Sequence, residues 1–138
     1  MEVVFTIGIM DMCHAGHLNL LRKMRETGKK TIVILHTDAS CYRIKGKIPI
    51  QHLDTRMKNL EITGLVDEIR VTDNDDPTVD MQAMLKEYPH CYFMRGDDNP
   101  KYPGYQFIEA HIPHEYISYT KGVSSSRLRT WLNRLFSS

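Results

Sequence analysis

Two histidines three positions apart, His14 and His17, stand where an apolar segment gives way to a helical pattern. Residues 8–17 read GIMDMCHAGH, and Gly16 lies between the histidines, where it allows close approach to the backbone. Free N–H groups and the helix dipole favour an anion at a helix start, and imidazole N–H groups can donate to phosphoryl oxygens. The pattern favours contact with phosphate. Two alternatives stay open, namely a metal site and histidines that pack or cap the helix.

The spacing of the histidines differs from that of helical zinc ligands, which are usually four residues apart. A structural zinc site also needs four ligands. The chain has three cysteines, Cys13, Cys41 and Cys91, and none forms a CxxC pair. An odd number of scattered cysteines is typical of reduced thiols in a cytoplasmic protein, which is the location we expect.

Further polar clusters follow other apolar segments. The segment Lys45-Gly46-Lys47 could cover phosphates or be a solvated loop. The segment RGDD at residues 95–98 could hold magnesium, ribose or base, or form a surface turn. His36 precedes Thr37 and Asp38, and we interpret it as structural. The segment YTKGVSSS at residues 119–126 could cap a helix or face a phosphate.

Apolar segments alternate with helical patterns along the chain. Buried strands are predicted near residues 2–8, 31–36, 66–71, 91–95 and 114–118. Helices are predicted near residues 16–28, 54–63, 105–110 and 124–136, and a further helix is predicted after the turn at residues 73–78, with Pro77 near its first turn. Residues 39–51 form a polar, basic stretch, and a loop is predicted at Lys45-Gly46-Lys47 and Pro49 within it. The alternation predicts one α/β domain over residues 1–138, with a parallel five-stranded sheet flanked by helices. The polar clusters would then meet at the carboxyl edge of the sheet, where such folds bind ligands.

The composition bounds the class of protein. The chain has 138 residues, 41% hydrophobic and 25% charged, with a formal net charge of +1. This balance does not argue for a nucleic-acid or membrane partner, because neither is favoured by a nearly neutral surface. No segment approaches the roughly 18 apolar residues of a membrane span.

Taken together, these motifs resemble the cytidylyltransferases of the glycerol-3-phosphate, phosphocholine and phosphoethanolamine type. The resemblance extends from about residue 3 to 135. It rests on the HAGH segment at residues 14–17, on Lys45 and Lys47, on residues 96–98 and on TKGVSSS at residues 120–126. HxGH alone belongs to a broad nucleotidyltransferase superfamily, and its combination with TKGVSSS is much more specific.

The resemblance implies a Rossmann-like homodimer that transfers CMP from CTP to a small phosphomonoester and releases pyrophosphate. Mg²⁺ would be bound through the substrate phosphates, with Asp11 or Asp97 as candidate protein ligands. A phosphomonoester is largely a dianion at pH 7 and is already a nucleophile. The protein therefore needs no serine or cysteine nucleophile, and must position two anions and neutralise developing charge.

The resemblance also assigns residues to three roles. The catalytic residues would be His14, His17 and Lys45. The nucleotide would contact Gly8, Ile9, Met10, Asp11, Gly16, Gly96, Asp97, Tyr119, Thr120, Gly122, Ser124, Ser125 and Ser126. The acceptor would contact Lys47, Asp38 and Arg56.

Three departures from the family pattern keep alternatives open. Arginines expected near the nucleotide are replaced by Gly64 and Tyr119, and either Arg95 or Arg127 and Arg129 could compensate. An ATP-dependent adenylyltransferase and a non-catalytic nucleotide-binding module are therefore alternatives. The acidic turn at residues 73–76 would suit an amine-bearing acceptor such as phosphocholine, with Tyr102, Tyr105 and Phe107 as aromatic faces, although a solvated turn and packing aromatics would give the same pattern.

Overall fold

The computed structural model describes residues 1–118 of the chain. The predicted C-terminal helix and the candidate residues from Tyr119 to Ser126 lie outside the described residues. The described elements are β1 (Val3–Gly8), η1 (Asp11–Cys13), α1 (Ala15–Glu26), β2 (Lys30–His36), α2 (Asp38–Lys45), α3 (Leu53–Thr63), β3 (Glu68–Thr72), α4 (Thr78–Glu87), β4 (Tyr92–Gly96), α5 (Tyr105–His111) and β5 (His114–Ile117).

The five strands form one sheet in the order β3-β2-β1-β4-β5, and every neighbouring pair is parallel. The predicted α/β class, with a five-stranded parallel sheet flanked by helices, is confirmed. The chain moves outward from β1 to β2 and β3, then returns to the other side of β1 for β4 and β5. The order of the strands therefore reverses between β1 and β4, the position at which open α/β sheets bind ligands.

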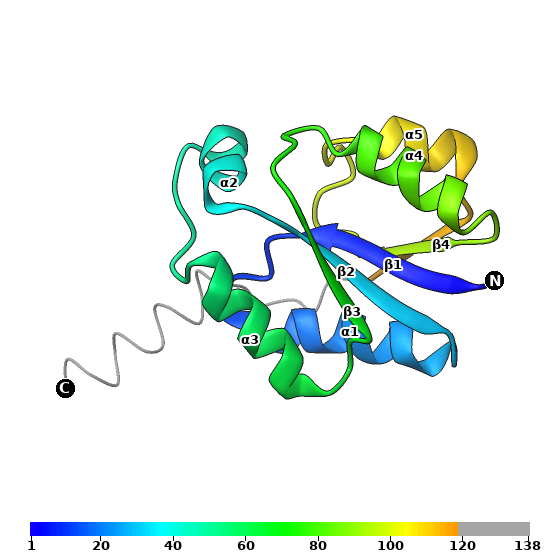
Figure 1. Ribbon diagram of the computed structural model, residues 1–138, viewed down its shortest axis with the longest axis horizontal. Helices are drawn as coiled ribbons and strands as arrows, with labels where there is room; N and C mark the ends of the chain where they lie inside the picture. Colours follow the sequence, from blue (N-terminus) through cyan, green and yellow to red (C-terminus); the bar gives the residue numbers. More distant parts are fainter. Residues whose placement is uncertain (119–138) are drawn as a thin grey trace.

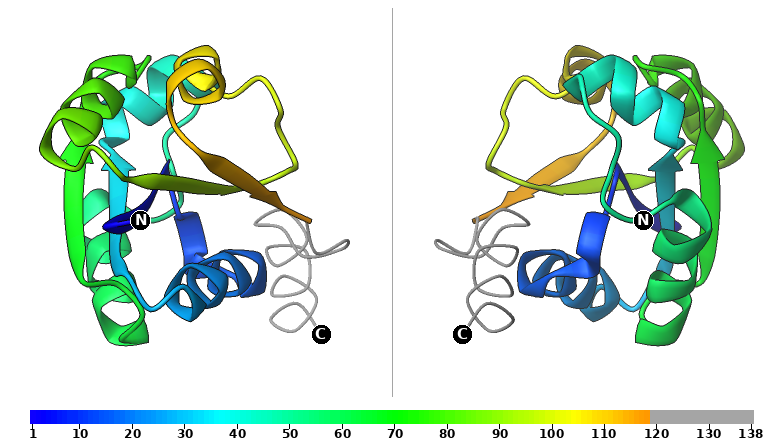
Figure 2. Two further views of the ribbon diagram at one scale, coloured as in Figure 1. Left: turned by 90° about the vertical axis from the view of Figure 1, so that its right-hand side faces the viewer. Right: turned by 90° about the vertical axis from the view of Figure 1, so that its left-hand side faces the viewer.

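Helices cover both faces of the sheet (Figures 1 and 2). Helices α1 and α3 lie on one face, α4 and α5 on the other, and α2 lies beyond the carboxyl end of β2. Alternate strand residues point to opposite faces, so Phe5 packs in the cluster with α4 and α5, whereas Val4 packs with α1 and α3. Burial on both faces explains why the strands are continuous apolar segments in the sequence.

Helix α2 occupies the first half of the polar, basic stretch, where no helix was predicted, and it ends at Lys45, the first residue of the predicted loop. The side chain of Thr37 accepts a hydrogen bond from Ser40 N at 3.0 Å and begins the helix. Gly46 ends it with φ of 75°, a left-handed conformation that glycine adopts without strain. Lys45 is consequently the last residue of α2, and the loop begins at Gly46.

Arg56 joins the elements around the carboxyl edge of the sheet. Its side chain is fully buried although it lies on α3. Its Nη1 donates to Ile9 O and His36 O, both at 2.9 Å, and its Nε donates to Gln51 O at 3.1 Å. Its Nη2 donates to Asp38 Oδ1 at 2.7 Å. One guanidinium therefore fixes the chain just beyond β1 and β2, the start of α2 and the entry to α3.

Within residues 1–118, no helix combines the length and the hydropathy that crossing a membrane requires.

The variant Arg56→Met tests this network. Removing the buried guanidinium leaves the carbonyl groups of Ile9 and His36 without this donor, and we expect the free energy of unfolding to fall by about 3–5 kcal/mol, since each buried acceptor left unsatisfied costs about 1–3 kcal/mol. The matched control is Arg43→Met, because Arg43 is half exposed and pairs with Asp73 and Asp75 on the surface. Urea denaturation should give a loss of about 1 kcal/mol or less for this control. Equal losses for the two variants would contradict the role of Arg56.

Candidate active site

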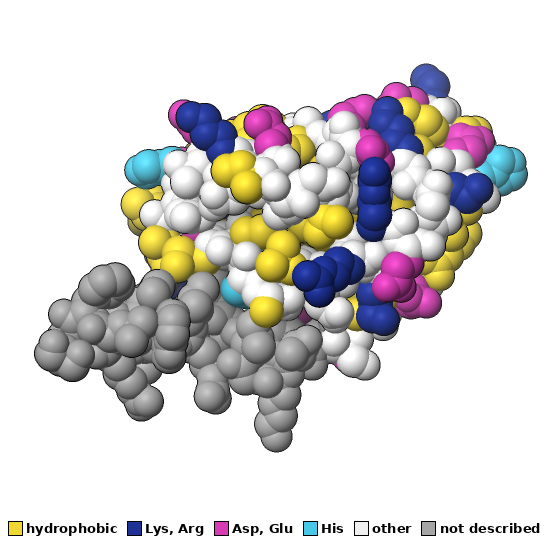
Figure 3. Space-filling view, turned by 90° about the horizontal axis from the view of Figure 1, so that it is seen from below, with side chains coloured by type: hydrophobic (Ala, Val, Ile, Leu, Met, Phe, Trp, Pro, Cys, Tyr) yellow, Lys and Arg dark blue, Asp and Glu magenta, His cyan; other side chains and the backbone are white. Residues whose placement is uncertain are grey.

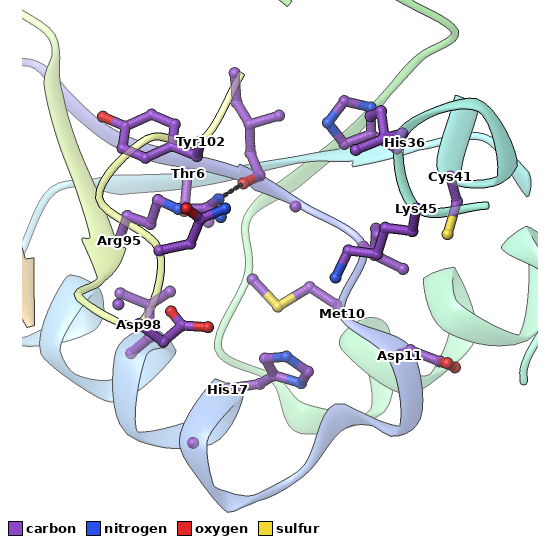
Figure 4. Close-up of a pocket in the computed structure, with 18 of the residues that line it drawn as sticks. Thr6, Met10, Asp11, His17, His36, Cys41, Lys45, Arg95, Asp98 and Tyr102 are labelled. Carbon is purple, nitrogen blue, oxygen red and sulfur yellow. Dashed lines mark hydrogen bonds between the residues drawn. The ribbon is translucent and has the colours of Figure 1, made fainter. Parts of the chain in front are cut away.

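A pocket of about 400 Å³ opens at the carboxyl ends of β1 and β4. Its walls come from the end of β1, the start of α1, the end of α2 with the following loop, and the end of β4 (Figure 4). Most of the predicted site residues among residues 1–118 line it, namely Gly8, Ile9, Met10, Asp11, His14, Gly16, His17, Lys45, Lys47 and Gly96. The structure thus gathers three sequence segments that are separated by about 30 residues or more.

His14 is the N-cap of α1, and its Nδ1 accepts a hydrogen bond from Gly16 N at 3.1 Å. An accepting Nδ1 carries a lone pair, so a neutral His14 has its proton on Nε2. Burial lowers the pKa of His14, and the negative charge of Asp98 partly opposes this effect. His14 therefore has the capping role, which was one of the predicted alternatives. It caps the helix through Nδ1 and keeps an N–H donor at Nε2.

His17 stacks on His14, with the ring centroids 3.8 Å apart and the planes 17° from parallel. Burial lowers its pKa to about 3, assisted by the charges of His14 and Lys45. Its Nδ1 is buried and has no hydrogen-bond partner within residues 1–118. His17 is therefore a neutral imidazole at physiological pH, and Nε2 is the ring nitrogen through which it can contact a ligand.

Lys45 and Lys47 reach the pocket from the other side. Lys45 projects from the end of α2 toward the space above Met10 and His17, where Figure 4 shows its ammonium group. Gly46 lets the chain turn sharply between the two lysines, so that both line the same wall. Two flexible cations facing a helix start form a suitable enclosure for an anionic ligand.

The segment between β1 and α1 is held in a strained conformation. Met10, Met12 and Cys13 have positive φ angles of 55°, 67° and 39°. Such backbone states cost of order 1–3 kcal/mol each and persist only where the surroundings enforce them. Met12 N donates to Gln51 Oε1 at 3.1 Å, which ties the strained segment to the residues before α3.

Asp11 lines the pocket, but its carboxylate accepts hydrogen bonds from Ile50 N at 2.8 Å and Gln51 N at 3.1 Å. Figure 4 shows its side chain directed away from the other labelled groups. Asp97 does not line the pocket, and its backbone N–H donates to Ile117 O. The adjacent Asp98 does line it. In the part of the chain that the structure describes, no three metal-binding side chains gather into a cluster.

Two of the predicted acceptor residues, Asp38 and Arg56, lie outside the pocket wall. They form an ion pair at 2.7 Å, and Asp38 also contacts His52 Nδ1 at 3.1 Å. The structure gives them a supporting role, because they fix the chain segments that carry the pocket residues. Lys47 remains the predicted acceptor residue that lines the pocket.

Arg95 and His36 also line the pocket, where the sequence had suggested Arg95 only as a replacement for the missing arginines and had indicated a structural role for His36. Arg95 projects from β4, and its guanidinium lies 4.5 Å from the centre of the Tyr102 ring. His36 is buried, and its Nδ1 lies 3.0 Å from Ser40 Oγ. In the sequence, the feature that could have identified both as pocket residues is their position at the carboxyl ends of predicted strands.

The structure does not support an aromatic cage for an amine. Tyr102 is buried, its ring face already holds Arg95, and Tyr105 and Phe107 lie outside the pocket wall.

Neither sign of charge dominates the face of the molecule drawn in Figure 3. Basic and acidic side chains are interspersed over its described surface.

The acidic turn is structural. Arg43 pairs with Asp73 at 3.0 Å and with Asp75 at 2.7 Å. Thr37 Oγ1 donates to Asp73 as well, which ties the turn to the start of α2. These contacts leave the two carboxylates engaged with α2 rather than directed toward a ligand in the pocket.

The fold and the pocket define an α/β protein whose pocket lies at a helix start, at the reversal of its strand order. A family model described as cytidylyltransferase-like matches residues 5–130. The chain belongs to this family of nucleotidyltransferases, as the resemblance in the sequence predicted.

The curated relatives include proteins named "Bifunctional protein HldE". The one from Campylobacter concisus is 34% identical over 128 residues, which cover 91% of this chain and 26% of that protein. The one from Pelobacter propionicus is 32% identical over 130 residues, covering 92% and 26%. The one from Yersinia enterocolitica is 42% identical over 98 residues, covering 70% and 20%. The chain thus spans about a quarter or less of the length of these relatives.

A solved structure has the same fold. The crystal structure of the lipopolysaccharide core biosynthesis protein from Thermoplasma volcanium aligns with a TM-score of 0.66 and 23% identity. The alignment covers 88% of this chain and 98% of that protein. At this identity the likeness establishes the fold alone.

His17 gives a prediction for stability against pH. Its pKa is about 3 in the folded chain, below the ordinary value of about 6.5. Above pH 6.5 the imidazole is neutral in both states. Between pH 6.5 and 3 the unfolded chain binds a proton that the folded chain does not, so stability falls as the pH falls. His17 can contribute up to about 1.4 kcal/mol per pH unit to this slope.

Urea denaturation of the wild type and of His17→Asn at pH 7 and pH 5 measures this contribution. We expect the free energy of unfolding of the wild type to fall more steeply than that of the variant. Parallel pH profiles would show that His17 is not held neutral by the fold.

Proposed function

We propose that this chain transfers a nucleoside monophosphate from a nucleoside triphosphate to a small phosphomonoester. The observation that carries the proposal is the pair of stacked, neutral histidines at the start of α1, facing Lys45 across a pocket at the reversal of strand order. Membership of the cytidylyltransferase-like family supports it. CTP is the first candidate for the nucleotide, on the family resemblance of residues 14–17 and 120–126.

In this reaction an oxygen of the acceptor phosphate attacks the α-phosphorus of the nucleotide. A new P–O bond forms, the bond from the α-phosphorus to the oxygen that bridges it to the β-phosphorus breaks, and pyrophosphate leaves with that oxygen. The acceptor supplies the nucleophile, so the chain contributes position and charge.

The residues at the start of α1 have the chemistry that this step needs. The Nε2–H of a neutral His14 can donate to a phosphoryl oxygen, and His17 presents its own Nε2 beside it. The free N–H groups of the first turn of α1 and the ammonium of Lys45 add positive potential. These donors are held by the helix and by ring stacking before a ligand arrives, which reduces the cost of ordering them.

Magnesium fits the pocket only through the substrate. The described residues provide no three-ligand cluster, and the carboxylate of Asp11 accepts two backbone N–H groups. Mg²⁺ commonly uses one or two carboxylates together with phosphate oxygens and water, and Asp98 at the pocket wall is suitable for this role. When bound, the ion would neutralise phosphate charge.

A second candidate uses ATP as the nucleotide. Gly64 and Tyr119 stand where the resemblance expects arginines near a cytidine nucleotide. The name of the HldE relatives specifies no nucleotide, so it does not decide between CTP and ATP.

The homodimer implied by the resemblance also remains a proposal, which sedimentation would test.

Pyrophosphate release measures the reaction directly. The purified chain with Mg²⁺ and either CTP or ATP is supplied with glycerol 3-phosphate, phosphocholine, phosphoethanolamine, a sugar 1-phosphate or FMN. We expect release with one nucleotide and one acceptor class, with phosphocholine disfavoured because Arg95 occupies the Tyr102 face. No release with any pair, while a nucleotide still raises the melting temperature, would favour a non-catalytic nucleotide-binding module.

The histidines are tested by matched substitutions. His14→Asn keeps an acceptor for Gly16 N but loses the Nε2 donor, whereas His14→Ala loses both. We expect each of His14→Asn, His14→Ala and His17→Ala to lower kcat by about 10²-fold or more, as for a lost transition-state donor. Melting temperatures should separate the cap from the donor, with His14→Asn more stable than His14→Ala. Turnover near that of the wild type in these variants would exclude the role.

A further inference from the structure

Arg95 is a largely buried cation for which the described residues provide little compensation. Its Nη1 donates to Ile7 O at 3.0 Å, and its guanidinium stacks on Tyr102. Its Nε is buried without a hydrogen-bond partner, and no carboxylate within residues 1–118 forms an ion pair with it. Asp98 lies close enough for its charge to act on Arg95 but makes no ion pair with it.

A guanidinium in such a position is costly. Arginine stays protonated in proteins, so the desolvation cost of burying its charge cannot be avoided by loss of the proton. Buried charges are normally paired, and an unpaired one is stable only at a considerable cost in desolvation. Stacking on Tyr102 and one carbonyl fix the orientation of Arg95 but leave its charge available to the pocket.

The position of Arg95 distinguishes it from the other cations of the pocket. Figure 4 shows Arg95 and Lys45 on opposite sides of the cavity, with His17 and Met10 between them. His14, His17 and Lys45 belong to the β1 and β2 side of the strand reversal, and Arg95 belongs to β4. Pro77, Met81 and Tyr102 line the pocket on the side of α4 and provide apolar walls for a small molecule.

We propose that Arg95 binds the phosphate of the acceptor. The inference rests on the proposed function and names a substrate-binding residue for it. Transfer requires two anions in one pocket, and the donors of α1 serve the triphosphate from one side. Because Nε is buried and one N–H of Nη1 is used by Ile7 O, Arg95 offers the N–H groups of Nη2 and the second N–H of Nη1 to an oxyanion on the other side, where the attacking oxygen must lie. The cation on the Tyr102 ring also disfavours an acceptor with a quaternary ammonium group.

The experiment measures binding of inorganic phosphate, as a probe of the acceptor site, by calorimetry. The triphosphate site is first saturated with a CTP or ATP analogue that has a methylene group between the α- and β-phosphorus and is not cleaved. The wild type should bind phosphate. Arg95→Met should weaken phosphate binding by about 10- to 100-fold, the range for a lost hydrogen-bonded charge, and should change the Kd of the analogue by less than about twofold.

Two further variants control the measurement. Arg70→Met removes another strand arginine, which pairs with Glu68 and Glu87 outside the pocket wall, and should leave both affinities unchanged. Arg95→Lys keeps the charge but not the fork, and should recover part of the phosphate affinity if Arg95→Met fails to fold.

Three results would overturn the proposal. They are a wild type that binds no phosphate, phosphate affinity that is equal in the wild type and Arg95→Met, and loss of analogue binding with phosphate binding intact. The last result would assign Arg95 to the nucleotide. Absence of pyrophosphate release from the wild type would count against the proposed reaction, whereas the phosphate titration reports on Arg95 independently.

Discussion

The buried guanidinium of Arg56 is the interaction on which the pocket depends. Parallel strands end with carbonyl groups that have no partner once the sheet stops, and Arg56 donates to two carbonyls at this edge, those of Ile9 and His36. The same side chain binds Asp38 at the start of α2 and Gln51 before α3. Because one rigid group satisfies all four, the ends of β1 and β2 have fixed positions relative to the helices that follow.

That constraint allows the strained turn between β1 and α1. Met10, Met12 and Cys13 adopt left-handed conformations only because neighbouring groups hold them. The residues just before α3 supply these contacts, since Asp11 accepts from Ile50 N and Gln51 N and Met12 donates to Gln51. This strained segment places His14 at the N-cap of α1, where its ring stacks on that of His17.

The acidic groups near the pocket are mostly engaged in structure. Asp38 pairs with Arg56, and Arg43 holds Asp73 and Asp75. The three cations that line the pocket, Lys45, Lys47 and Arg95, form no ion pair among the residues that the structure describes. Against these three cations the pocket wall carries two carboxylates, Asp11 and Asp98, of which Asp11 accepts backbone N–H groups, so the wall has an excess of positive charge in a chain with a net charge of only +1. The partition of charge, rather than its total, makes the site suitable for phosphates.

The strands, most helices and the gathering of residues 8–17 with Lys45 and Gly96 could be predicted, because apolar patterns and the topology of parallel sheets determine them. Helix α2 could not, since its first turn depends on Thr37 as a cap and its residues show no clear apolar face. The burial of Arg56 was likewise invisible, because an arginine in a polar segment normally implies a solvated or ligand-binding cation. Only the packed structure shows that backbone carbonyls are its partners.

The two sides of the pocket differ in how the chain encodes them. The side that includes the histidines is largely one continuous segment, residues 8–17, in which spacing alone carries the chemistry. The side of β4 depends on a stack between Arg95 and Tyr102, which come from the end of a strand and the loop that follows it. In-line displacement needs the attacking and leaving groups on opposite sides of phosphorus. Under the proposed function, we therefore expect substitutions at the end of β4 to change the choice of acceptor without disturbing the phosphate donors of α1, because the two sets of residues share the pocket but no element of secondary structure.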